Sequence, residues 1–207
     1  KQSFGGDADT AMVEPSLFGD FENAVDRISS GGTSEDVALY KDLGDYENIR
    51  KIFDGVLEQY NLEHKKMSLV LFENALEHLC RIHRIIRGVR GNALLVGVGG
   101  SGKQSLVRIS SYISRCKNFQ ITLTKSYGQA ALLDDLRIMY RNAGHQRKPT
   151  VFLFTEAELK DEVFLETLNS VLMTGEVTGL FAKDELIAMT ADLQKAFSQE
   201  RPGVEIG

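Results

Sequence analysis

The stretch that decides the fold is ALLVGVGGSGKQ, which occupies residues 93–104. Its first part, residues 93–96, is wholly apolar, a pattern typical of a strand buried on both faces of a sheet. Residues 97–103 then match the pattern G-x-x-x-x-G-K. Beyond Lys103 the apolar residues recur at helical spacing and predict a helix over residues 104–114. We therefore predict a strand, a glycine-rich turn and a helix in direct succession.

This succession predicts a phosphate-binding loop. Glycines let successive backbone N–H groups point at one anion, and the N-terminus of the following helix adds a partial positive charge. Lys103 would reach the β and γ phosphates of a nucleoside triphosphate. A glycine-rich turn without a ligand is the alternative, which the lysine and the flanking elements disfavour. The predicted nucleotide-binding residues are Gly97, Val98, Gly99, Gly100, Ser101, Gly102, Lys103, Gln104 and Ser105.

The residue after the lysine departs from the usual pattern. Gln104 stands where a Ser or Thr hydroxyl normally ligates Mg²⁺. Ser105 comes one residue later, and one helical step rotates a side chain by about 100°. Gln104 offers a neutral carbonyl oxygen that could ligate Mg²⁺ or hold one of its waters. We expect metal binding to be altered here and not necessarily lost.

A second apolar run, VFLF at residues 151–154, ends in Thr155-Glu156. Nucleotide hydrolases of this kind follow such a strand with an Asp for the Mg²⁺ shell and a Glu for the attacking water. One alignment makes Thr155 the metal-associated residue and Glu156 the catalytic acid; a one-residue shift makes Glu156 the metal acid. Either register leaves the site one acid short. The nearby acids are expected to form a solvated face: Glu158, Asp161, Glu162 and Glu166.

Strand-like and helical segments alternate through the second half of the chain. Strands are predicted at residues 119–124 and 151–154, and helices at 129–140 and 164–173. Alternation of this kind predicts an α/β fold with a parallel sheet flanked by helices.

We divide the chain into a loop-rich strap (1–44), a helical lead-in (45–90), a P-loop α/β core (91–190) and a tail (191–207). In the strap, Leu17, Phe18 and Phe21 are expected to dock on a neighbouring surface. The lead-in should hold a helix from about residue 46 to 60 and another from an N-cap at Ser68 to Gly88. His78 and His83 lie five residues apart, so they do not share a helix face and are interpreted as satisfied helix histidines.

Composition excludes several classes of partner. The 29 acidic and 24 basic residues give a net charge of −5, which disfavours nucleic acid and anionic membranes as partners. The two cysteines define neither a disulfide framework nor a zinc site. No apolar run approaches the ~18 residues of a membrane span. Because the sequence starts at Lys1 without an initiator Met, we expect a segment of a longer chain.

Several strings together resemble the fourth AAA+ module of dynein heavy chains, particularly of the axonemal (ciliary) type. They span most of residues 15–190 and are more specific than the glycine-rich loop alone. In chain order they are LFGDF (17–21), the segment 46–61, LFENALEHL (71–79), RIHRIIR (81–87), GVGGSGKQSL (97–106), VFLFT (151–155) and the segment 169–181.

The resemblance implies the large α/β subdomain of a P-loop NTPase (AAA+) module that binds ATP or ADP with Mg²⁺. In that family the first module of a six-module ring is the main motor ATPase, and the fourth is usually assigned a regulatory part. The implied partners are neighbouring AAA+ modules of the same heavy chain, other dynein chains, and a microtubule reached through a stalk outside this segment. The implied location is the cytoskeleton, in the axoneme of a cilium or flagellum, with the cytoplasm as the alternative.

Two departures from the family limit the expected activity. The family strand often ends in Thr-Asp where this chain has Thr155-Glu156, which keeps the charge but lengthens the side chain. A complete module also needs a five-stranded sheet, a sensor residue, a helical lid and an arginine finger from the next module. No second apolar run comparable to VFLF follows Glu156. We therefore expect an incomplete module.

The favoured hypothesis is a regulatory nucleotide-binding module with weak or no hydrolysis. One alternative is an active ATPase with Glu156 as general base; another is a structural module without nucleotide. A separate P-loop enzyme such as a small-molecule kinase would need lid arginines after the third strand, where only Arg201 occurs.

Overall fold

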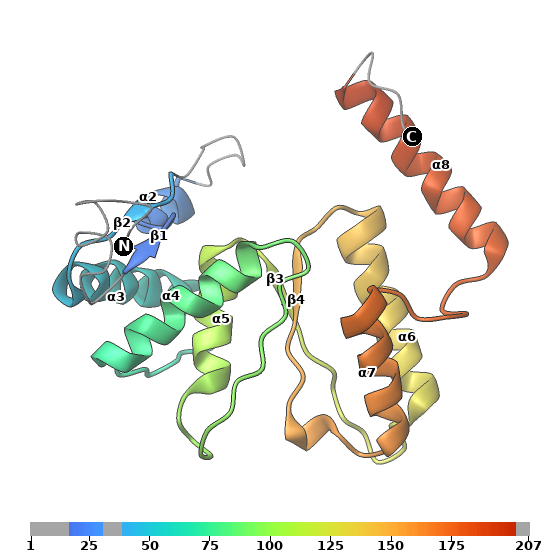
Figure 1. Ribbon diagram of the computed structural model, residues 1–207, viewed down its shortest axis with the longest axis horizontal. Helices are drawn as coiled ribbons and strands as arrows, with labels where there is room; N and C mark the ends of the chain where they lie inside the picture. The colour runs from blue at the N-terminus through green and yellow to red at the C-terminus, as the bar shows by residue number, and fades with distance from the viewer. Residues whose placement is uncertain (1–16, 31–38, 202–207) are drawn as a thin grey trace, which may run out of the picture. The chain divides into compact units, whose positions relative to one another are not determined.

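The computed structural model describes residues 17–30 and 39–201 (Figure 1). The rest of the predicted strap (1–16 and 31–38) and the end of the predicted tail (202–207) lie outside the described residues. The chain divides into two compact units, one ending at Arg115 and the other beginning at Cys116. Each unit is described by itself.

The first unit is a helical cluster capped by the strap. Its strands β1 (Phe18–Gly19) and β2 (Lys41–Asp42) pair antiparallel and flank α2 (Ala24–Ser29). Three longer helices follow: α3 (Tyr46–Glu63), α4 (Glu73–Arg87) and α5 (Lys103–Ile113). Helix α4 packs along α5, and α3 contacts both (Figure 1).

Apolar residues of the strap complete the core of this unit. Leu17 and Phe21 are fully buried, and the Phe21 ring centroid lies 5.0 Å from that of Phe53 on α3. The predicted docking is therefore confirmed for these two residues, whereas Phe18 is only partly buried. Burial of a side chain of this size contributes about 1.5–3 kcal/mol to the free energy of folding.

The two predicted lead-in helices form, but the second begins later than predicted. The Asp45 side chain caps α3 by accepting from the Asn48 N–H at 2.9 Å. Ser68 does not cap α4, whose N-cap is Phe72. The reason lies in α3: the Leu71 carbonyl, which a helix from Ser68 would use for its own hydrogen bonds, accepts instead from Arg50 Nε at 3.1 Å. This bond keeps the segment just before Phe72 outside the helix.

The predicted buried strand at residues 93–96 is not formed. Leu94 and Val96 are 91% and 87% exposed. An isolated strand leaves its backbone N–H and C=O groups unpaired, so it needs a hydrogen-bonded neighbour. Within the described part of the chain, no segment pairs with residues 93–96.

The second unit contains the predicted parallel pairing. Strands β3 (Lys117–Phe119) and β4 (Thr150–Phe152) pair with Asn118 opposite Val151. They are joined through α6 (Gln129–Tyr140) and a π-helical turn, η1 (Arg141–His145). After β4 come the 3₁₀ turn η2 (Glu156–Glu158) and α7 (Glu162–Thr174). The parallel α/β organisation and α6 are confirmed, although β3 is shorter and earlier than the predicted strand.

The core of this unit lies between α6 and α7. Its buried members are Leu132, Leu136, Met139, Phe164 and Leu180. Phe119 and Phe152 on the two strands, together with Phe154, pack against this cluster. The core therefore supports the ends of β3 and β4, where the predicted acids lie.

The last helix, α8 (Lys183–Glu200), was not predicted, and none of its residues is buried. Polar contacts attach it to the segment that follows α6. They are ion pairs of Arg141 with Glu185 and of Arg147 with Glu200 at 2.5 Å, and a contact of 3.2 Å between His145 Nε2 and the Asp192 carboxylate. Among the described helices, none has the length and apolar character needed to cross a membrane.

Candidate functional site

The glycine-rich loop closes around its own lysine. Lys103 Nζ donates to the carbonyls of Gly97 and Val98, both at 2.7 Å, and to Ser101 Oγ at 3.1 Å. The ammonium group therefore lies in the concavity of the loop, beside the first turn of α5.

The glycines of the loop are required by its backbone. Gly100 and Gly102 have φ angles of 76° and 79°, in the left-handed region that other residues rarely adopt. Gly102 is also the N-cap of α5. A Cβ at Gly97 would lie 3.6 Å from Lys103 Nζ, inside the concavity. The loop thus places the Lys103 ammonium and the N-terminus of α5 side by side, two groups that attract anions.

The two residues after the lysine lie in the first turn of α5. Gln104 is exposed, and Ser105 is partly buried. The predicted role of Gln104 in holding Mg²⁺ or one of its waters stays a prediction.

The predicted acids lie in the second unit, after β4. The ladder between the strands continues past β4, since the Leu153 N–H donates to the Phe119 carbonyl at 2.9 Å. The Thr155 side chain then caps η2 by accepting from the Glu158 N–H. Glu156, the first residue of η2, is exposed. Thr155 and Glu156 are therefore fixed at the carboxyl end of a parallel strand, the usual place of ligand sites in α/β folds.

Glu158 corrects the prediction of a solvated acidic face. Its side chain is only 5% exposed, and its carboxylate accepts from the Gln120 side chain at 2.6 Å and from the Thr155 N–H. The pattern Thr-x-x-Glu at residues 155–158 is the sequence signature of a capping box and could have identified this residue. The prediction was right for the remaining acids, which are exposed: Asp161, Glu162 and Glu166.

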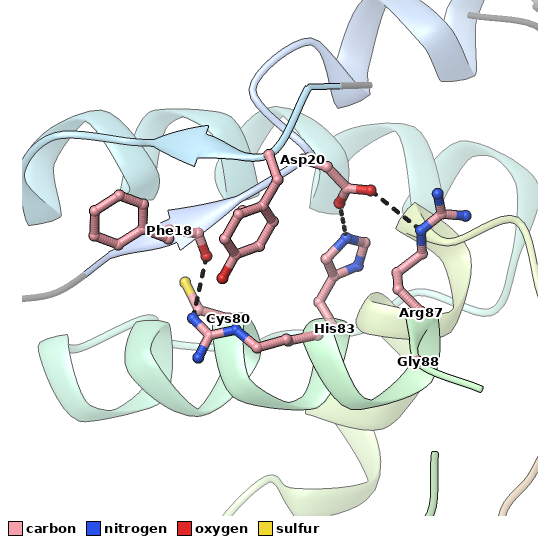
Figure 2. A pocket seen from close by; sticks show the side chains of 9 residues that line it. Phe18, Asp20, Cys80, His83, Arg87 and Gly88 are labelled. Atoms are coloured by element: carbon pink, nitrogen blue, oxygen red, sulfur yellow. Dashed lines mark hydrogen bonds and ion pairs between the residues drawn. The ribbon is translucent and has the colours of Figure 1, made fainter. Parts of the chain in front are cut away.

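A separate cavity of about 190 Å³ lies where the strap meets α4 (Figure 2). Asp20 borders it with one carboxylate oxygen 2.5 Å from His83 Nε2 and the other 3.1 Å from Arg87 Nε. The other ring nitrogen of His83 lies 3.0 Å from Ser114 Oγ, at the end of α5. His83 is thus a satisfied core histidine, as interpreted from the sequence, and it also joins the strap to the phosphate-loop helix.

Acid should weaken this attachment of the strap. The hydrogen bond with His83 lowers the pKa of Asp20 from 3.8 to about 2, and the positive charges of His83 and Arg87 act in the same direction. These effects outweigh burial of the carboxyl group, which raises its pKa. A carboxyl group with a lowered pKa in the folded state stabilises that state fully when the pH is above its pKa in the unfolded state. This stabilisation is lost as the pH falls from about 4 to about 2. We expect Asp20→Asn to remove about 2 kcal/mol of stability at neutral pH and to flatten the pH dependence in this window.

The measurement is amide hydrogen exchange of the strap and α4 between pH 2 and pH 5, corrected for the intrinsic effect of pH. Glu22→Gln is the matched control, because Glu22 is an exposed strap acid paired with Lys41. A pH dependence of Asp20→Asn equal to that of the parent would contradict the prediction.

The family described as the P-loop-containing dynein motor region D4 matches residues 67–205. The chain belongs to this family. The matched range contains both the glycine-rich loop and the strand-end acids, so the predicted resemblance to the fourth dynein module is confirmed. The described α/β unit is consistent with an incomplete AAA+ module.

Similar proteins include dynein axonemal heavy chain 10 of Homo sapiens, which is 42% identical over 199 residues, or 96% of this chain. The dynein-1-alpha heavy chain of the flagellar inner arm I1 complex of Chlamydomonas reinhardtii is 44% identical over 202 residues, or 94% of the chain. The ciliary dynein beta chain of Tripneustes gratilla is 50% identical over 147 residues, or 71% of the chain. The chain spans only 3–4% of the length of these relatives. The names of these relatives agree with the expected axonemal setting.

Proposed function

We propose that this chain is a nucleotide-binding module of a dynein heavy chain, which holds ATP or ADP at residues 97–105 and acts mainly in regulation. The observation that carries the proposal is the position of Lys103 Nζ, in the concavity of a glycine loop at the N-terminus of α5. On binding, Lys103 would exchange the carbonyls of Gly97 and Val98 for phosphate oxygens, which accept from a cation more strongly because they are charged. The backbone N–H groups of the loop and of α5 would bind the same phosphates.

We expect weak or absent hydrolysis because the two predicted metal-holding positions depart from the usual pattern. Gln104 lacks the hydroxyl that normally binds Mg²⁺, and Thr155 stands where such sites use an Asp. Mg²⁺, when bound, would neutralise phosphate charge, with Gln104 and Thr155 as its candidate holders. Glu158 is already engaged by Gln120 and Thr155. Glu156 is therefore the exposed acid of this turn and the candidate catalytic residue.

A bound nucleotide that is not hydrolysed can still change the motor. It would join the subdomain to neighbouring AAA+ modules and favour one conformation of the heavy chain, because a ligand stabilises the state that binds it more tightly. The proposed partners are these modules, other dynein chains, and a microtubule reached through a stalk outside this segment. The proposed setting is the axoneme of a cilium or flagellum.

The exposed position of Glu156 at the strand end also supports a second candidate, an active ATPase with Glu156 as general base. In that case Gln104 and water would complete the Mg²⁺ shell, and a neighbouring module would supply an arginine finger.

Single-turnover hydrolysis in the complete heavy chain separates the two candidates. We expect Glu156→Gln to leave the turnover of the parent unchanged and nucleotide to remain bound through purification. Glu166→Gln is the control, since Glu166 is an exposed acid on α7. If Glu156→Gln alone removes a measurable turnover, the active-enzyme alternative replaces the regulatory one.

A further inference from the structure

The cavity between the strap and α4 combines aromatic rings with arginines (Figure 2). The rings of Phe18 on β1 and of Tyr40, just before β2, stack with their centroids 6.3 Å apart. The guanidinium group of Arg84 lies 5.7 Å from the centroid of the Tyr40 ring, and the Arg87 side chain lines the same cavity. Aromatic residues and arginine are enriched where proteins bind one another. The cavity therefore has the composition of an interaction site.

The cavity has room for a single side chain. Its volume of about 190 Å³ is below the ~300–1,000 Å³ of pockets that hold cofactors and drug-sized molecules. Part of its lining is the Cys80 thiol, and burial raises the pKa of this thiol to about 11, so this wall is uncharged at neutral pH. Exposed apolar residues continue the surface along the chain: Leu39 precedes Tyr40 and is 74% exposed, and Val89 follows Gly88 and is 98% exposed. An apolar side chain of a partner therefore fits here.

Arg84 gives the cavity a positive charge that no acid of the same unit neutralises. Asp20, the acid that borders the cavity, already pairs with His83 and with Arg87. None of the ion pairs among the described residues includes Arg84. Its guanidinium group lies against the aromatic ring and 3.5 Å from the Phe18 carbonyl, and the residue is exposed. A carboxylate from a partner could form charge-assisted hydrogen bonds with this group.

We propose that this cavity is a docking site for an acidic segment of the same heavy chain, in which an apolar side chain enters the cavity and an adjacent Asp or Glu pairs with Arg84. A basic segment is disfavoured, because its charge would meet Arg84 and Arg87. The site lies within the unit that ends at Arg115. It is separate from the loop at residues 97–105, so the proposal goes beyond nucleotide binding and does not depend on it.

Covalent linkage explains why the occupant belongs to the same heavy chain. Residues 1–207 correspond to only 3–4% of the three relatives described above, so most of a heavy chain of that length lies outside this segment. Stable interfaces between separate proteins bury about 1,200–2,000 Å², far more than a cavity for one side chain offers. A linked segment can reach an effective concentration of about a millimolar, at which a small contact is sufficient.

Photocrosslinking in the complete heavy chain tests the site. The probe is p-benzoylphenylalanine in place of Leu39, the exposed residue beside Tyr40, and mass spectrometry identifies the crosslinked peptide. We expect a crosslink to a segment of the same heavy chain in which an apolar residue adjoins Asp or Glu. Arg84→Gln should reduce the yield of this crosslink about tenfold, because it removes a charged hydrogen-bond donor.

Arg81→Gln is the matched control for the loss of a positive charge from α4. Arg81 lies three residues earlier on the helix, pairs with Glu77 at 3.2 Å and does not line the cavity, so the yield should not change. Exchange of charges then separates a lost ion pair from a loosened strap. Arg84→Glu should abolish the crosslink, and replacement of the identified acid by Lys in the same protein should restore most of the yield.

The remaining outcomes overturn the proposal. They are equal yields in Arg84→Gln and Arg81→Gln, failure of the charge exchange to restore the crosslink, and no crosslink in the parent. A crosslink confined to residues 1–16 or 31–38, or to a different protein chain, would identify another occupant and overturn it as well. Each of these results leaves the proposed function standing, because nucleotide binding is assigned to residues 97–105 and is measured separately.

Discussion

Lys103→Ala is expected to empty the nucleotide site while leaving the fold intact. In the free protein the Lys103 ammonium contacts two carbonyls and one hydroxyl of an exposed loop. Water can replace the lysine at these acceptors, so the free energy of unfolding should change little. A bound triphosphate would instead lose a cation in direct contact with its charge, which corresponds to about 3 kcal/mol, or about a hundredfold in affinity.

The measurement is the nucleotide content of the purified complete heavy chain, followed by titration with a fluorescent ATP analogue. Lys51→Ala is the matched control: Lys51 belongs to the same unit, and its exposed ammonium pairs with Glu47 on α3 at 2.8 Å. The control should retain the nucleotide content of the parent. Equal affinity in Lys103→Ala and the parent would show that the loop does not bind nucleotide.

Local patterns in the sequence predicted much of the fold. The boundaries of α6 agree with the prediction, because Gly128 precedes the helix and apolar residues at helical spacing follow from Ala130. The parallel pairing of β3 and β4 followed from the alternation of strands and helices. The glycine loop and the start of α5 were also recognisable, since the positive φ angles of Gly100 and Gly102 require glycine.

Non-local contacts account for the errors. Residues 93–96 have the composition of a buried strand, but burial depends on a partner that composition does not supply. The later start of α4 goes with a hydrogen bond from Arg50 on α3 to the Leu71 carbonyl, and the strap is attached by a contact between Asp20 and His83, which are 63 residues apart. Helix α8 is different, because Leu186, Met189, Leu193 and Phe197 recur at helical spacing and could have predicted it from the sequence.

The candidate site was only partly visible for a related reason. Glu156 and Glu158 are two residues apart and chemically alike, yet one is exposed and the other is 5% exposed. The difference arises from Gln120, which reaches Glu158 from the neighbouring strand segment. Sequence shows which acids follow a strand, and the packing of the sheet decides which of them can meet a ligand.

Phe164→Ala should strongly destabilise the second unit. The Phe164 side chain on α7 is fully buried among residues of α6, and its ring lies 6.1 Å from the Tyr127 ring in an edge-to-face arrangement. Truncation removes this apolar surface from the core and leaves a cavity, which together cost about 3–5 kcal/mol. Phe119, Phe152 and Phe154 pack against the same core, so the ends of β3 and β4 would lose support as well.

Hydrogen exchange of α6, β3 and β4 measures this loss, because these amides exchange when the unit opens. We expect protection to fall by about two orders of magnitude or more, since each 1.4 kcal/mol is about tenfold in the opening equilibrium. Leu165→Ala is the control on the adjacent position, where the side chain is 50% exposed, and it should cost less than about 1 kcal/mol. Similar losses for the two variants would mean that the core is not centred on Phe164. If only Phe164→Ala causes a large loss of protection, the positions of Thr155 and Glu156 depend on the packing of α6 against α7. The reason is that Phe119, Phe152 and Phe154 contact this core and also support the strand ends.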